Sequence, residues 1–224
     1  MPEPEPKDEI VFTKSNVKIG LSLVCILLAV MCIAIPLMTS YNALVNSNIQ
    51  VTRASANIQT DLERRADLLP NLASEIKGSA KFEHATLVDT IAARAGDASE
   101  IRNRIKSTDT SSGTAIDSMQ TSDRQLTTLF GGIMTLNEAY PTLQTTEQFK
   151  DFEAQTTATE NEILVDRQTY NAAVMQYQSI VQSFPTNLVA KQYGFDANRY
   201  HMWAPDNQTY ADAVPAITFG DMTL

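Results

Sequence analysis

The chain has 224 residues, enough for one domain behind a membrane segment or for two small domains. It contains only 8 glycines and 43% apolar residues, and no stretch alternates apolar and polar residues for long. These features predict helices rather than strands. The net charge of −9 argues against a general nucleic-acid binder, because such a protein needs a basic surface.

The first predicted element is a membrane helix. The run IGLSLVCILLAVMCIAIPLM (19–38) carries no charge and is long enough to cross a hydrocarbon core of about 30 Å. We expect a retained single-pass anchor behind a polar tail (1–18). A signal peptide is the alternative, but the run is long for one and no small-x-small cleavage site follows it.

Lysines before the anchor predict its orientation. Lys7, Lys14 and Lys18 precede the run, whereas only Arg53 lies within the next twenty residues. The positive-inside rule then places the N-terminus in the cytoplasm and the large domain on the extracytoplasmic side. The bias is small, so the cytoplasmic side stays the alternative.

The anchor is expected to continue as a helical stalk, because Leu44, Val51 and Ile58 follow at seven-residue steps. An apolar stripe at helical spacing extends this pattern: Leu62, Ala66, Leu69, Ala73, Ile76 and Ala80. Pro70 lies inside the stripe. Since proline lacks an amide donor and clashes with the preceding turn, a kink or a restart of the helix is expected there.

Later helices are predicted from apolar rows at seven-residue spacing, here called seams. KSTDTSSGT (106–114) is a loop by composition, and a helix begins near Ala115 and ends at Pro141. Its seam consists of Met119, Leu126, Ile133 and Tyr140. Gly131 and Gly132 interrupt this helix, either as a weak point or as a close contact between helices.

The next helix carries the clearest seam and ends at Phe184-Pro185. Its members are Phe149, Ile163, Tyr170, Tyr177 and Phe184, with Thr156 as the gap and Val174 and Val181 as companions. Because the seams are long and the connections short, we expect an all-α antiparallel bundle over 39–192. A mostly irregular tail (193–224) is expected to pack on it, with VPAITF as a short extended piece.

A dense charge cluster stands out in the stalk: Asp61, Glu63, Arg64, Arg65 and Asp67. These residues fall off the apolar stripe, so we expect solvent-side ion pairs between Asp61 and Arg65 and between Arg64 and Asp67. We hypothesise that this face makes contacts between copies of the chain. A solvated surface without partners is the alternative.

Nothing in the sequence predicts catalysis, a cofactor or a metal. It lacks the motifs of hydrolases, P-loop nucleotide binders, dinucleotide binders and zinc proteases. Glu63 and Asp67 lie one turn apart, a spacing that is common on helix surfaces. The two histidines, His84 and His201, have no ligand companions at metal-site spacing.

Five segments carry a resemblance to a known family: YNALV (41–45), LERRADLLPNLASEIKGSAKFE (62–83), AR (93–94), EAYPTLQTTEQF (138–149) and RQTYNAAVMQYQSIVQSFPTNLVAKQYGF (167–195). In this order and spacing the chain resembles the LemA family. The resemblance implies long antiparallel helices behind one transmembrane segment and no established enzymatic activity. It also implies that some relatives are associated with membrane remodelling in magnetosome-forming bacteria. Other relatives look like neighbours of membrane metalloproteases. Family members are often drawn with the helical domain in the cytoplasm, against the lysine count.

Together these features predict a non-enzymatic, single-pass membrane scaffold or adaptor that assembles with itself. Its expected partners are the lipid bilayer, further copies of the chain and a membrane protein such as a protease; nucleic acid is not expected. The alternatives are a regulatory or adaptor subunit of a membrane protease and a membrane-shaping protein.

Overall fold

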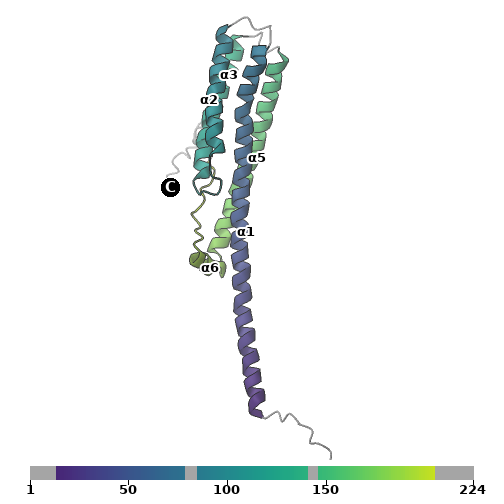
Figure 1. The fold of residues 1–224 in the computed structure, drawn as a ribbon, viewed down its shortest axis with the longest axis vertical. Coiled ribbons are helices and arrows are strands. Elements are labelled where there is room, and N and C mark those ends of the chain that lie inside the picture. Colours follow the sequence, from purple (N-terminus) through teal and green to yellow (C-terminus); the bar gives the residue numbers. More distant parts are fainter. Residues whose placement is uncertain (1–13, 79–84, 141–145, 205–224) are drawn as a thin grey trace, which may run out of the picture.

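The computed structural model describes residues 14–78, 85–140 and 146–204, and within these ranges the chain is helical and contains no strand (Figure 1). The helices in chain order are α1 (Lys14–Gly78), α2 (Ala85–Lys106), α3 (Ala115–Ala139), α5 (Glu147–Gln182) and α6 (Thr186–Tyr193). The predicted all-α class is therefore confirmed.

Helix α1 is the spine of the molecule and runs unbroken for 65 residues from the apolar segment into the bundle (Figure 1). The stalk residues Leu44, Val51 and Ile58 are fully buried, so the predicted continuation of the helix is confirmed. The large apolar side chains between residues 21 and 38 are instead 42–68% exposed. Within the described residues, α1 is the one helix long and apolar enough to cross a membrane.

Of the two expected effects of Pro70, a kink or a restart of the helix, the restart is wrong. Helix α1 continues through Pro70 to Gly78, and its neighbours on the inner face, Leu69 and Leu72, are buried. A proline inside a helix removes one hydrogen bond. Burial of the apolar side chains on both sides of Pro70 offsets that loss, because packing contributes more to helix stability than local propensity does.

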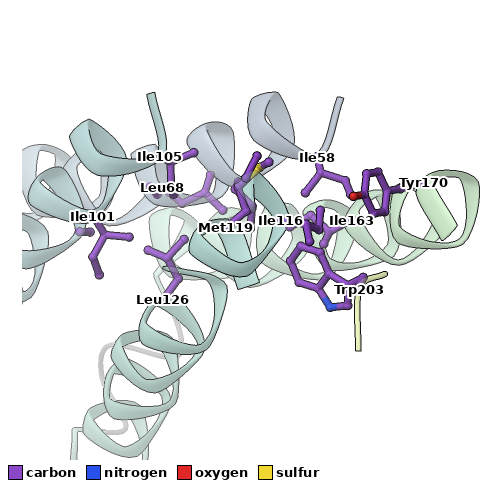
Figure 2. Packing of buried hydrophobic residues seen from close by; sticks show 14 of the residues in the cluster. Ile58, Leu68, Ile101, Ile105, Ile116, Met119, Leu126, Ile163, Tyr170 and Trp203 are labelled. Carbon is purple, nitrogen blue, oxygen red and sulfur yellow. The ribbon is translucent and has the colours of Figure 1, made fainter. Parts of the chain in front are cut away.

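Helices α2 and α5 both lie against α1. The Gln59 side chain donates a hydrogen bond of 2.7 Å to the carbonyl of Ile105, near the end of α2. Because α2 begins only a few residues after the end of α1 and its own end returns to the level of Gln59, α2 is antiparallel to α1. Helix α5 shares the most extensive contact with α1 and crosses behind it on the way from the top of the bundle towards α6 (Figure 1). Figure 2 shows buried side chains from α1, α2, α3 and α5 meeting in one cluster, with Trp203 at its edge.

The seam of α5 is confirmed except at its last position. Phe149, Ile163, Tyr170 and Tyr177 are at most 2% exposed. Phe184 is 80% exposed, so its expected place in the core is wrong. Helix α5 ends at Gln182, and beyond a helix end the seven-residue spacing no longer sets the direction of a side chain.

The loop before α3 and the glycines within α3 also have clear outcomes. Helix α2 ends at Lys106 and α3 begins at Ala115, which confirms the predicted loop. A Cβ atom on Gly132 would lie 1.6 Å from Nη1 of Arg94. Gly132 is therefore a close contact between α2 and α3, whereas Gly131 borders open space.

Residues 194–204 lie along the bundle and are hydrogen-bonded to α5. The Tyr170 hydroxyl donates to the carbonyl of His201 at 2.7 Å. The Asn171 side chain donates to the carbonyl of Trp203 at 3.1 Å and accepts from its amide at 2.8 Å. This part of the tail thus packs on the bundle, while VPAITF (214–219) lies outside the described residues.

Replacing Asn171 by Ala removes both hydrogen bonds to Trp203. We expect this substitution to destabilise the protein by about 1–3 kcal/mol and to raise hydrogen exchange at residues 199–204, because buried backbone groups of Trp203 lose their partners. Thermal unfolding in detergent followed by circular dichroism, together with exchange mass spectrometry, measures both effects. The exposed Gln168→Ala is the control, and equal behaviour of the two variants would contradict the prediction.

Candidate functional site

An ionic cluster with a buried centre joins three helices in the middle of the bundle, and its outer member Glu160 is exposed. Arg65 of α1 is only 3% exposed. Its guanidinium donates to Asp123 of α3 at 2.8 Å and to Glu160 of α5 at 2.9 Å. Arg167 of α5 binds the second carboxylate oxygen of Asp123. We call these four residues the arginine layer.

Arg65 points inward because of its position on α1. It lies seven residues after Ile58 and seven before Leu72, so it occupies the same row as the buried stalk residues. The expectation that Arg65 faces solvent and pairs with Asp61 is therefore wrong. The seven-residue row from Leu44 through Val51 and Ile58 was the signal in the sequence that points to a buried arginine.

Two aromatic rings complete the arginine layer. The Arg65 guanidinium carbon lies 5.1 Å from the ring centroid of Phe130, and that of Arg167 lies 4.4 Å from the Trp203 ring. Such cation–π contacts stabilise partly desolvated guanidinium groups. Through Trp203 the layer also holds the C-terminal segment against α5. Sequence reasoning missed Asp123, Glu160, Arg167 and Trp203, since no local pattern marks them as partners of Arg65.

Asp61 is the second buried member of the predicted charge cluster. It is 8% exposed, and burial, reinforced by the negative charges of Asp166 and Glu162 and by a hydrogen bond with Asp166, raises its pKa to about 6. Arg64 opposes this shift from 3.6 Å away. Asp61 therefore gains a proton under mildly acidic conditions, well above the usual range of an aspartate.

The remaining members of the predicted cluster lie nearer to the surface. Arg64 is exposed and pairs with Glu162 of α5, and Asp67 pairs with Arg102 of α2 at 2.8 Å. The expected pair of Arg64 with Asp67 is thus replaced by bonds to two different helices. Glu63 is half-buried. The predicted face is therefore divided between the core and the surface, and its use between copies stays a prediction.

The chemistry of the arginine layer is that of a structural cross-link. Both ends of the Arg65 guanidinium are bound to carboxylates, and Phe130 lies over it. The Nε–H of Arg65 has no hydrogen-bond partner, but it is buried and out of reach of a substrate in solution. Within the described ranges, no group of three or more histidine, cysteine, aspartate or glutamate side chains is placed to hold a metal ion.

Fold and site together define a class of protein: a helical bundle, cross-linked by buried ion pairs, that is continuous with one helix long and apolar enough to cross a membrane. The sequence model of the LemA family matches residues 54–219. The chain belongs to the LemA family, as its sequence segments predicted.

Two relatives come from Paramagnetospirillum magneticum: Magnetosome protein MamQ 1 and Magnetosome protein MamQ 2. Each is 24% identical to this chain over 198 residues, which cover 81% of this chain and 72% of the relative. The similarity thus spans most of both proteins.

The neighbours Arg64 and Arg65 offer a matched test of the arginine layer. We expect Arg65→Met to destabilise the bundle by about 3–5 kcal/mol, because Asp123 and Glu160 lose a buried partner. Arg64→Met removes an exposed pair and is expected to cost at most about 1 kcal/mol. Chemical denaturation in detergent, followed by circular dichroism, gives both values. Similar losses in the two variants would contradict a buried layer that holds the helices together.

Asp61 predicts a specific dependence of stability on pH. Its pKa is about 6 in the folded chain and 3.8 in an unperturbed aspartate, so the folded state binds more protons between these values. Stability is then expected to fall as pH rises through this window. Asp61→Asn mimics the protonated form and should stabilise the protein at pH 7 by about 1 kcal/mol, discounted for partial solvent access.

Unfolding midpoints measured from pH 4 to pH 8 test this prediction. The Asp61→Asn variant is expected to lose part of the decline in stability seen in the wild type. Asp67→Asn, at the half-buried pair with Arg102, serves as the control. A destabilised Asp61→Asn variant at pH 7 would show that the Asp61 carboxylate is favourable there and would contradict the raised pKa.

Proposed function

We propose that this LemA-family protein is a non-enzymatic, single-pass membrane scaffold or adaptor. The observation that carries the proposal is the unbroken helix α1, which passes from the apolar segment into the bundle core. The arginine layer bonds α1 to α3 and α5. A bundle fixed in this way moves as one body with its anchor, which suits a platform that presents surfaces at the membrane.

The proposed orientation follows the lysine count before the anchor. Lys7, Lys14 and Lys18 favour a cytoplasmic N-terminus and an extracytoplasmic bundle. The function proposed here depends only on attachment of the bundle to a bilayer and applies to either side.

Self-assembly is the second part of the proposal. Arg65 and Asp61 are buried, so the part of the predicted contact face that another copy can reach is Arg64, with the half-buried Glu63 and Asp67. Arg64 pairs there with Glu162 of α5. Val165 follows Glu162 by one helical turn on α5 and is 59% exposed. An exposed apolar side chain beside an ion pair suits an interface between copies. Confinement by the anchor raises their effective concentration.

The mass of the full-length protein in mild detergent tests self-assembly. We expect light scattering, corrected for bound detergent, to give a discrete multiple of the 24.7 kDa chain. Val165→Asp should shift the assembly towards monomers by placing an unpaired charge in the apolar contact. Ala93→Asp, at an exposed position of α2, which makes no contact with α5, is the matched control and should leave the mass unchanged.

A wild-type monomer over the full concentration range would contradict self-assembly and leave an adaptor for a different membrane protein. Affinity capture from native membranes would then be the next step. An unchanged assembly in Val165→Asp would instead exclude this face of α5 while leaving self-assembly itself intact.

A further inference from the structure

The end of the bundle nearest the anchor carries an unusual set of exposed apolar side chains. Phe184 is 80%, Leu188 57% and Tyr193 63% exposed, and all three lie in or next to α6. On α1, Met38 is 68% and Tyr41 is 40% exposed. We call these five residues the base collar. Soluble surfaces rarely gather large apolar side chains in this way unless something covers them.

The base collar is continuous with the apolar surface of the anchor. The rings of Tyr41 and Tyr193 lie 4.9 Å apart, which fixes α6 beside α1 at the end of the apolar segment. Figure 1 shows α6 at the lower end of the bundle, alongside α1. Between the two helices lies an open pocket of about 390 Å³, lined by residues that include Leu37, Met38 and Leu188.

Distance along α1 places the collar at the edge of a bilayer. Tyr41 follows residue 38, the end of the expected anchor, by about 5 Å at 1.5 Å per residue. The headgroup region on each side of a hydrocarbon core of about 30 Å is some 5–7 Å thick. A helix that spans the bilayer with residues 19–38 therefore holds Tyr41 and its neighbour Tyr193 at the level of the lipid headgroups.

The charge distribution independently points to the same surroundings. Helix α1 carries no charged residue from Ile19 to Thr52, and the chain carries none from Gln168 to Ala190. The charged residues of α5 and of the bundle part of α1 all lie further from the anchor. A protein end that lies at an apolar boundary avoids charges because their desolvation is costly.

Helix α6 has the make-up of a helix that lies at a membrane surface. Val189 and Ala190 face the bundle and are buried, whereas Leu188 faces out. Lys191 is exposed, and a lysine at this level can extend its ammonium group to lipid phosphates while its stem stays on the apolar surface. Tyrosines are typical of the same zone because one end of the ring is apolar and the other is wet.

We propose that the base collar is seated in the interfacial layer of a phospholipid bilayer, with acyl chains filling the pocket between α1 and α6. The bundle then stands on the membrane through two contacts, the anchor and α6, and its tilt is restricted. This inference rests on the proposed membrane attachment of α1. It adds a lipid-binding surface outside the anchor itself.

Site-directed spin labelling of the full chain tests the proposal. The two native cysteines, Cys25 and Cys32, are replaced by Ala, and single labels are introduced by Leu188→Cys, Phe184→Cys, Leu28→Cys or Ala158→Cys. Each protein is reconstituted into vesicles of phosphatidylcholine with a minor fraction of phosphatidylglycerol. Collision of the label with oxygen, which partitions into lipid, is compared with collision with a water-soluble nickel chelate.

We expect labels at 188 and 184 to collide with the nickel chelate several-fold less, and with oxygen more, than the label at 158. Their depth should lie between that of 158 and that of 28. If the labels at 188 and 184 behave like the label at 158 while the label at 28 is in lipid, the collar proposal is overturned and the membrane attachment of α1 is kept. If the label at 28 is also in water, membrane attachment fails as well. If 188 is shielded from both reagents, protein covers the collar and the lipid assignment is overturned.

Discussion

The buried positive charge of Arg65 is the constraint on which the bundle depends. A guanidinium removed from water is tolerated only when carboxylates and further hydrogen bonds compensate for its lost hydration. Asp123 and Glu160 supply those carboxylates from α3 and α5. Hydrogen-bonded ion pairs need specific distances and directions. They therefore fix the register of α1 against two other helices more strictly than apolar packing alone does.

The same constraint reaches the C-terminal segment. Arg167 shares Asp123 with Arg65 and lies over the Trp203 ring. The backbone of Trp203 is held by Asn171, one turn further along α5. A segment without regular secondary structure is thereby ordered along the bundle by contacts that begin at one buried arginine.

Charge divides the molecule along its length. The middle of the bundle contains paired and partly buried charges, including Asp61 with its raised pKa, whereas the end next to the anchor contains exposed aromatic and aliphatic side chains. In the proposed function, both regions suit a platform that is attached to a membrane. Paired charges keep the helices in register, and the uncharged end meets a bilayer at a low electrostatic cost.

The sequence by itself determined the helical class, the long apolar segment at 19–38, the loop before Ala115 and most core positions, such as Leu44 and Tyr177. These features depend on composition and on spacing within one helix, which are local properties. Only the tertiary structure decided that α1 passes unbroken through Pro70 and that Phe184 leaves the core. It also decided how the charge of Arg65 is compensated in the core. The partner Asp123 lies 58 residues away in the sequence, so no local pattern indicates the pair. Periodicity shows which face of a helix is turned inward, but a charge on that face is stable only with partners that the folded chain brings to it.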